Sequence, residues 1–404
     1  MKGLATEESN PQIARDLRPF FVGWFLYVVV ALLLGCAGLR TMSQSFDFRN
    51  FYTAGYLMRS SPSQLYDLQR QQQLQSALIS PNPLALPFVH PSYEALLYAP
   101  FSLLSYGDAY LCYLLFNLLI LAALFLYGYP LFAAYIPLWQ PRPGLMLYPY
   151  LPLLVAFWHG QNALLFLWIC CAVWLQIPKG HEFRAGSLLA LGLFKFHVAI
   201  PIAILCAVRR SWRFSAGFLG TSAAVIVLCI WLTGGAGFVL FVHHLVTTSL
   251  VHDQSQAAQS AILVFPRGMV NLVGLLSPIT QHLSAGLAFV TVAGVSIAVM
   301  GLGLYLVRIA EDESVAFAIA VLCGMLVSYH LYVSDAALIL LPLALLAGRL
   351  SRTLLLTTYV LPLVVMLGMG RGWNFLLVAP VVWMLASAAG AARSREAVPE
   401  AAVG

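Results

Sequence analysis

Residues 283–307 read LSAGLAFVTVAGVSIAVMGLGLYLV, an uninterrupted run without a charged side chain. This run exceeds the roughly 20 apolar residues that a helix needs to cross the hydrocarbon core of a bilayer. Similar runs recur along all 404 residues, of which 61% are hydrophobic and only 9% are charged. Soluble domains carry about 25% charged residues. The composition therefore excludes a soluble protein and predicts an all-α, multi-spanning membrane protein.

The apolar runs differ in length, and their lengths set the expected topology. The first extends from about Phe20 to Leu39, and others lie near 108–128, 131–137, 145–158, 162–177, 185–207, 214–233, 283–307, 315–329, 336–348, 353–369 and 373–389. We expect about ten to twelve crossings, some of them broken or half-crossing helices, because several runs are shorter than a straight span. The sequence predicts one transmembrane domain over 1–390, with an outer loop at about 40–92, and a cytoplasmic tail at 391–404.

The outer loop contains three pairs of adjacent apolar residues. Phe51-Tyr52, Leu57-Met58 and Leu65-Tyr66 have the spacing of the apolar stripe of helices that lie on a membrane surface. The spacing predicts amphipathic helices here, and an ordinary solvated loop is the alternative.

Lysine and arginine residues orient the spans, because short cytoplasmic loops are enriched in them. They predict cytoplasmic loops around Lys179, Arg184, Arg209, Arg210, Arg213, Arg308, Arg349 and Arg352, with a cytoplasmic N-terminus after Arg15 and Arg18. The run 185–207 has basic loops at both ends, so the chain is expected to turn back near Lys195-Phe196-His197. The opposite side then collects the following polar residues: Asp47, Glu94, His159, Gln161, His243, His244, His252, Asp253, Arg267, His330, Asp335 and Arg371.

Several classes of function find no support in the sequence. The net charge of +6 is no nucleic-acid signal, because Arg209, Arg210 and Arg213 form the one basic cluster. The seven cysteines lie in apolar runs without metal-ligand spacing, which is typical of packing residues. His243, His244, His252 and Asp253 match no familiar zinc pattern, and a polar loop is the alternative. We expect no metal or other cofactor and no nucleic-acid partner.

Three ionisable residues stand where chemistry at a membrane boundary is plausible. Asp47 follows the first span and is a candidate general base, because partial burial can raise a carboxylate's pKa toward working pH; a solvated acid or a partner for Arg49 is the alternative. His330 lies with Asp335 in a polar patch between two apolar runs, where ionisable groups are costly and usually functional; a polar loop is the alternative. Lys195 interrupts an apolar run and could snorkel or bind a phosphate or a carboxylate.

Weaker candidates surround these residues. His159 and Gln161 flank Gly160 in a turn and suit hydrogen bonding to a polyol such as a sugar. Arg267 lies on the predicted outer side, where arginine is uncommon, and its guanidinium could bind a lipid phosphate through two N–H groups. A structural role at a helix end is the alternative.

Six segments, in order along the chain, form a recognisable set. The first comprises residues 47–57, DFRNFYTAGYL, with Leu65-Tyr66-Asp67, and the second comprises residues 88–101, FVHPSYEALLYAPF. The others are His159-Gly160-Gln161-Asn162, the stretch from Ala185-Gly186 to Phe194-Lys195, Arg209 to Arg213, and Ser328 to Asp335. This set resembles glycosyltransferase family 87, whose members are polyprenyl-phosphate-mannose-dependent mannosyltransferases and their relatives of the membrane GT-C class. The first two segments are similar to its first outer loop and to its Phe-x-Tyr-Pro-Pro segment. Two departures are His90-Pro91-Ser92 for Tyr-Pro-Pro and Phe196 for the proline that follows the lysine.

The resemblance implies a GT-C fold and an inverting transfer of a sugar, either mannose or another hexose or a pentose. The donor would be a polyprenyl-phosphate sugar, and the acceptor a lipid, glycan or protein on the outer face of a cytoplasmic membrane. It implies that Asp47 is the general base and that His330 lies near a phosphate. Gln161, Lys195, His159, Arg267, Tyr52 and Asp335 are the residues expected to bind substrate.

A transporter is the main alternative, because isolated charges in a many-span protein also describe one. We find no inverted repeat, and the polar residues collect on one side and not at the midplane. These observations favour the transferase.

Overall fold

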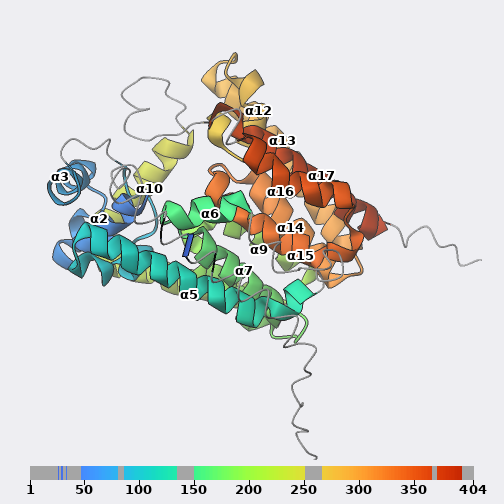
Figure 1. Cartoon of the computed structure of the whole chain (residues 1–404), viewed down its shortest axis with the longest axis horizontal. Coiled ribbons are helices and arrows are strands. Elements are labelled where there is room, and N and C mark those ends of the chain that lie inside the picture. The colour runs from blue at the N-terminus through green and yellow to red at the C-terminus, as the bar shows by residue number, and fades with distance from the viewer. Residues whose placement is uncertain are drawn as a thin grey trace, which may run out of the picture.

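The computed structural model describes residues 26, 29–30, 33, 47–80, 86–133, 150–250, 266–365 and 371–393. The expected first span at 20–39 lies almost wholly outside these residues, as do His252, Asp253 and the end of the tail. Every regular element within the described ranges is helical, which confirms the all-α fold. Figure 1 shows α2 and α3 at one end of the molecule with α5 beside them, and α13, α16 and α17 on the opposite side.

The helices follow the apolar runs closely. The main ones are α2 (Phe48–Ser60), α3 (Leu68–Leu78), α4 (Ser92–Tyr98), α5 (Tyr106–Ala133), α6 (Leu151–Trp158), α7 (Ala163–Gln176), α8 (Glu182–Leu191), α9 (Phe196–Arg209), α10 (Trp212–Leu250), α12 (Leu272–Thr280), α13 (Ala285–Ile309), α14 (Glu313–Val327), α15 (Leu340–Leu345), α16 (Arg352–Val364) and α17 (Val378–Arg393). Short 3-10 helices join them: η1 (Pro62–Gln64), η2 (Phe101–Leu103), η5 (Leu193–Lys195), η6 (Pro266–Gly268), η7 (Val333–Ile339), η8 (Ala347–Arg349) and η10 (Arg371–Leu377).

Local chemistry fixes where several of these helices begin. The side chains of Ser284, Asp312 and Ser351 accept hydrogen bonds from backbone N–H groups in the first turns of α13, α14 and α16. Such caps satisfy donors that the helix itself leaves unpaired.

Four stretches of the described residues are long and apolar enough to cross a membrane: Tyr106–Leu124, Trp212–Val246, Ala285–Ile309 and Trp373–Arg393. The pair α8 and α9, bent by 60°, would be a fifth such stretch if it crossed the membrane as one span. Four shorter apolar helices accompany these stretches. Short and broken helices were expected from the run lengths. The count of about ten to twelve crossings stays a prediction, because the first span lies outside the described residues.

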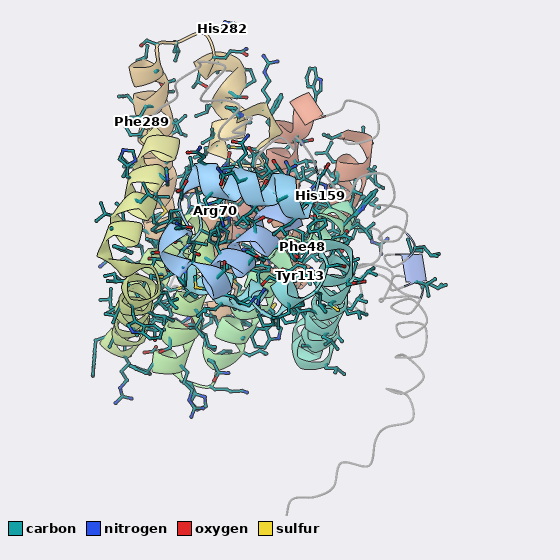
Figure 2. The ribbon with its side chains drawn as sticks, turned by 90° about the vertical axis from the view of Figure 1, so that its left-hand side faces the viewer. Phe48, Arg70, Tyr113, His159, His282 and Phe289 are labelled. Carbon is teal, nitrogen blue, oxygen red and sulfur yellow. The ribbon has the colours of Figure 1, made fainter. Side chains whose placement is uncertain are left out.

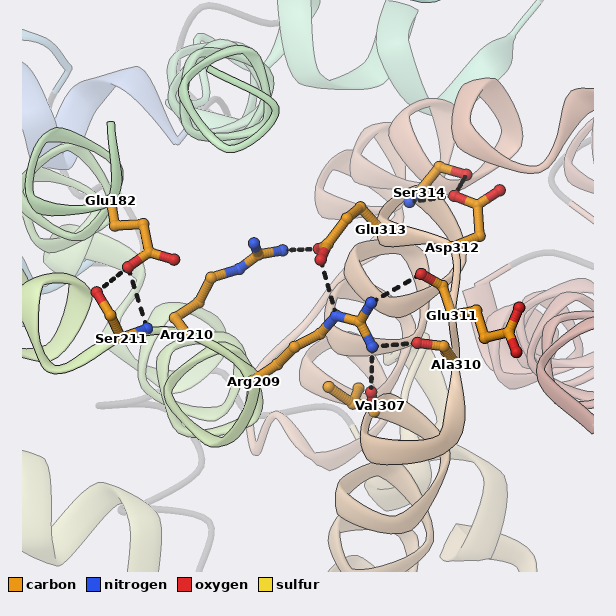
Figure 3. A network of polar contacts seen from close by, with 10 residues as sticks. All are labelled: Glu182, Arg209, Arg210, Ser211, Val307, Ala310, Glu311, Asp312, Glu313 and Ser314. Atoms are coloured by element: carbon orange, nitrogen blue, oxygen red, sulfur yellow. Dashed lines mark hydrogen bonds and ion pairs between the residues drawn. The ribbon is translucent and has the colours of Figure 1, made fainter. Parts of the chain in front are cut away.

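The pair α8 and α9 enters and returns on the same side. Ser211, just after α9, contacts Glu182 at the start of α8 through both its backbone N–H and its hydroxyl (Figure 3). The turn at η5 therefore lies at the far end of the pair. The expected reversal near Lys195 is present.

A second pair has the same form. α14 rises from Glu313 to Val327, and η7 with α15 returns to η8, where Arg349 bonds Asp312 at 2.5 Å. Arg209 and Arg210 at the end of α9 also pair with Glu313 (Figure 3). We call this end of the molecule, marked by Arg209, Arg210 and Arg349, the arginine face. Both turns lie away from it.

The outer-loop helices are present, but their apolar stripe does not face lipid. Phe51, Leu57 and Leu65 are at most 1% exposed. The reason is that α4 and α5 pack against α2, and α10 packs against η1. Phe48 stacks on Tyr113 of α5 with ring centroids 5.0 Å apart (Figure 2). The apolar spacing is therefore that of a helix packed into the protein.

Candidate functional site

Five chain junctions meet at the ends of the helices that lie away from the arginine face. They are the start of α2, the segment before α4, the α6–α7 turn, the α8–α9 turn and the α14–η7 loop. Their polar side chains form what we call the polar cluster: Asp47, His90, Glu94, His159, Gln161, Asn162, Lys195, His197, Ser328, His330 and Asp335. Residues separated by up to 288 positions in the sequence thus contribute to one site.

Asp47 stands directly before α2 and is held by the α6–α7 turn. Its Oδ2 accepts a hydrogen bond of 2.5 Å from Gln161 Nε2 and lies 3.3 Å from His159 Nδ1. The backbone N–H of Phe48 donates to the carbonyl of His159 at 3.1 Å. The side chain of Asp47 remains 32% exposed. The carboxylate is therefore oriented by two neighbours and still open to an incoming group.

Gly160 makes this arrangement possible. It has a φ of +67°, a backbone conformation that favours glycine, and an added Cβ would stand 2.7 Å from Phe48 Cβ. Tyr110 and Tyr113 of α5 donate from their hydroxyls to the carbonyls of Trp158 and Gln161. The aromatic side chains of α5 thus contact both α2 and the turn that holds Asp47.

The pKa of Asp47 departs from the sequence-based expectation. Burial raises the pKa of the carboxyl, but the hydrogen bonds of His159 and Gln161 and the charges of His159 and Arg49 together outweigh burial, so the pKa lies below its ordinary value. The expected rise toward working pH is therefore wrong. The group is ionised at neutral pH because donors that the sequence did not place beside it stabilise its charge.

Lys195 meets a carboxylate, one of the partners that its position suggested. Its Nζ lies 2.6 Å from Asp335 Oδ1, and both residues are less than 10% exposed. The second oxygen, Oδ2, accepts from the backbone N–H of Tyr332 at 3.1 Å. His197 and Ser328 lie 2.7 Å apart through Nδ1 and Oγ. The tips of the two helix pairs are joined by these contacts.

His330 lies among these groups. Its ring packs edge-on against Tyr332, with centroids 4.8 Å apart, and faces His197 at 6.1 Å. Burial lowers the pKa of His330 to about 4, and the charges of Asp335, His90, Lys195 and Asp47 also act on it. His330 is thus a neutral imidazole at pH 7 and lies within electrostatic reach of both Asp47 and the Lys195–Asp335 pair.

His90, Glu94 and Asn162 were not predicted from the sequence as site residues. Glu94 is buried, accepts a hydrogen bond from Asn162 Nδ2, and its Oε2 lies 2.9 Å from His90 Nδ1. The usable signal was the spacing of four between His90 and Glu94, across the start of α4.

Two predicted substrate-binding residues lie outside the hydrogen bonds of the cluster. The Tyr52 hydroxyl donates to the Leu104 carbonyl at 2.9 Å, and exposed Arg267 donates to Gln281 at 2.5 Å. His244 lies 3.1 Å from the carbonyl of Tyr66, near η1. The roles of Tyr52 and Arg267 in binding substrate stay predictions. Among the described residues, no group of three or more His, Cys, Asp or Glu side chains is arranged to hold a metal ion.

Comparison with known families gives one match. Residues 88–334 match the model of glycosyltransferase family 87, a segment that contains every residue of the polar cluster except Asp47 and Asp335. Comparison with curated proteins and with solved structures finds no match. The matched segment covers more than half of the chain and includes the whole α8–α9 pair and α14 of the second pair. The chain therefore belongs to glycosyltransferase family 87 and is a membrane glycosyltransferase.

Proposed function

We propose that this glycosyltransferase takes a sugar from a polyprenyl-phosphate donor and delivers it to a hydroxyl of a lipid, glycan or protein acceptor, with Asp47 as the general base. The observation that carries the proposal is the geometry of Asp47, an oriented and partly exposed carboxylate at the point where the five junctions meet. The family match supports the transferase over a transporter.

The reaction is a single displacement at the anomeric carbon of the sugar. The acceptor oxygen forms a bond to that carbon, the bond between the carbon and the phosphate oxygen breaks, and the polyprenyl phosphate leaves. The proton of the acceptor hydroxyl passes to Asp47. Because attack and departure occur on opposite sides of the carbon, its configuration is inverted. A carboxylate with a lowered pKa is a weak base, so its proton transfer accompanies bond formation and does not precede it.

The opposite part of the cluster suits the leaving group. A departing phosphate carries negative charge, which donors and cations aimed at it stabilise in the transition state. Lys195 and His330, from two different helix pairs, supply such groups within reach of each other. In this proposal no metal takes part, because the ammonium of Lys195 provides positive charge and the neutral ring of His330 provides an N–H donor.

The arrangement of the helices supports a site on the outer side of a cytoplasmic membrane. α9 has 14 residues, with Lys195 before its first residue and Arg209 at its end. At 1.5 Å per residue, the cluster lies about 20 Å from the arginine face, across most of a hydrocarbon core about 30 Å thick. Arginine-rich loops favour the cytoplasm, so the cluster would face the other side, at a depth where a polyprenyl chain presents its phosphate.

The proposal is tested by sugar transfer in membranes that contain the wild-type chain, compared with matched membranes that lack it. A panel of radiolabelled polyprenyl-phosphate hexoses and pentoses is offered beside the corresponding nucleotide sugars. Transfer from a polyprenyl-phosphate sugar and from no nucleotide sugar is the expected result, and the anomeric configuration of the product should be inverted. Transfer from nucleotide sugars alone, or retention of configuration, would overturn the proposal.

A further inference from the structure

Glu94 is a buried carboxylate of the site, as Asp335 is, and no step above uses it. Its side chain is 2% exposed, and it lies in the first turn of α4. One oxygen accepts from Asn162 Nδ2, and the other lies 2.9 Å from His90 Nδ1. Burying a carboxylate is costly unless it is paired and hydrogen-bonded, so this position demands both partners.

The α6–α7 turn connects Glu94 to Asp47. Gln161 donates to Asp47, and the next residue, Asn162, donates to Glu94. The turn therefore holds the base and the His90–Glu94 pair in a fixed relation. The ring of His90 is kept in place by Phe51, whose centroid is 5.4 Å away edge-on, and by Phe88, which stacks on it at the same distance.

Two features fix how His90 meets the rest of the cluster. With Nδ1 occupied by Glu94, the other ring nitrogen, Nε2, is the one left to meet a ligand. The side chain is 24% exposed, so that a ligand can reach it. The charges of His90 and Lys195 both act on His330, as do the opposite charges of Asp335 and Asp47. His90 and Lys195 thus bring two basic groups from separate segments to the same part of the cluster as the neutral ring of His330, and such groups can bind an anion together.

We infer that His90, positioned by Glu94, is a binding residue for the phosphate of the polyprenyl-phosphate donor and of the polyprenyl phosphate that leaves. The inference rests on the proposed function for its substrate. It adds a contact from the segment before α4, which none of the steps above uses. Asn162 and Glu94 are positioning residues that act through His90.

Binding, and not turnover, gives the cleanest test, because it does not depend on finding the acceptor. A radiolabelled short-chain polyprenyl phosphate is titrated onto the purified full-length chain in lipid nanodiscs. The variants are His90→Ala, His90→Gln and Glu94→Gln, and the control is His282→Ala. His282 is exposed and lies at the end of the molecule away from Phe48 and His159 (Figure 2). Thermal unfolding of each variant confirms that it folds.

A charge-assisted hydrogen bond to phosphate predicts a loss of affinity of about tenfold or more for His90→Ala, with His282→Ala unchanged. Glu94→Gln keeps the acceptor for Asn162 and removes the charge, so it should weaken binding in the same direction but less. Unchanged affinity in folded His90→Ala and His90→Gln would overturn the inference.

Kinetics separate this inference from the proposed function. His90→Ala should raise the donor KM and leave the acceptor KM as it is; a rise in the acceptor KM alone would place His90 on the acceptor side and overturn the inference. If the wild type binds polyprenyl phosphate through His90 but transfers no sugar from a polyprenyl-phosphate donor, the proposed function fails and the anion site stands.

Discussion

Replacing Lys195 by methionine isolates the contact that joins the two helix pairs. Lys195 and Asp335 lie 2.6 Å apart, with side chains only 6% and 9% exposed. Methionine has a similar length and keeps the packing, but it leaves the Asp335 carboxylate buried without the Lys195 ammonium, while the backbone N–H of Tyr332 still donates to it at 3.1 Å. The perturbation is therefore an uncompensated buried charge and not a cavity.

The size of the effect follows from burial. Removing one partner of a buried ion pair costs about 3–5 kcal/mol, whereas replacing both partners by apolar residues is often neutral. We expect Lys195→Met to lose about 3–5 kcal/mol and the double variant Lys195→Met with Asp335→Leu to recover most of that loss. The matched control is Arg349→Met, which breaks a pair whose side chains are 40% and 43% exposed. An exposed pair contributes about 0–1 kcal/mol.

The assay is unfolding of the purified chain in mixed micelles by titration with a denaturing detergent, followed by the loss of helical circular dichroism. The reasoning is refuted if Lys195→Met costs no more than Arg349→Met. It is also refuted if the double variant is less stable than Lys195→Met, because the unpaired charge would then not be the cause.

Three further predictions concern other parts of the molecule. Gly160→Ala should cost about 1–3 kcal/mol more than Gly180→Ala, because both have positive φ but only Gly160 would bring a Cβ against Phe48; detergent unfolding measures the difference. Because the folded-state pKa of His330 is about 4, below the ordinary 6.5, the unfolded chain binds the proton more readily, so stability should fall as the pH drops from 6.5 toward 4. His330→Gln should flatten that pH dependence, and an unchanged slope would contradict it. Arg209→Ala should cost about 1.5–3 kcal/mol, because this guanidinium bonds Glu313 and carbonyls at the end of α13; a loss as small as that of Arg349→Met would contradict it.

The helices could be predicted from the sequence because hydrophobic run length reports them directly. The run 283–307 corresponds to α13, and the turn near Lys195 followed from basic loops at both ends of one run. Two of the three apolar pairs of the outer loop, Phe51-Tyr52 and Leu57-Met58, lie in a helix as predicted, whereas Leu65-Tyr66 lies in the turn between η1 and α3. The pairs could not show what covers the stripe, because lipid and a neighbouring helix such as α5 demand the same apolar side chains.

The site was predicted residue by residue but not as contacts. Asp47, His330 and Lys195 were selected singly, because ionisable residues are rare in such a chain. The partner of Lys195, Asp335, is 140 positions away, and nothing in local spacing pairs them. The pKa of Asp47 was predicted in the wrong direction for the same reason: its donors, His159 and Gln161, come from a distant turn.

His90 and Glu94 were missed because a histidine beside a proline in a short segment carries little signal. Burial of Glu94 and its contact with Asn162 decide their importance, and both depend on how α4 packs against the α6–α7 turn. Tyr52, in contrast, was expected to bind substrate from the family resemblance. In the structure it lies in α2, one turn after the first residue of the helix, and its hydroxyl donates to the Leu104 carbonyl.

The central claim is that Asp47 takes the proton of the acceptor. The most direct measurement is steady-state transfer by purified wild type, Asp47→Asn and Asp67→Asn, with saturating donor and acceptor. Asp67 is an acid of the same outer loop that caps α3, a role asparagine can keep. Asp47→Asn should lower kcat by about 10²–10⁴-fold with the donor KM little changed, because a general base acts in the transition state, and Asp67→Asn should match the wild type. A wild-type kcat for Asp47→Asn would contradict the account and move the base elsewhere in the polar cluster.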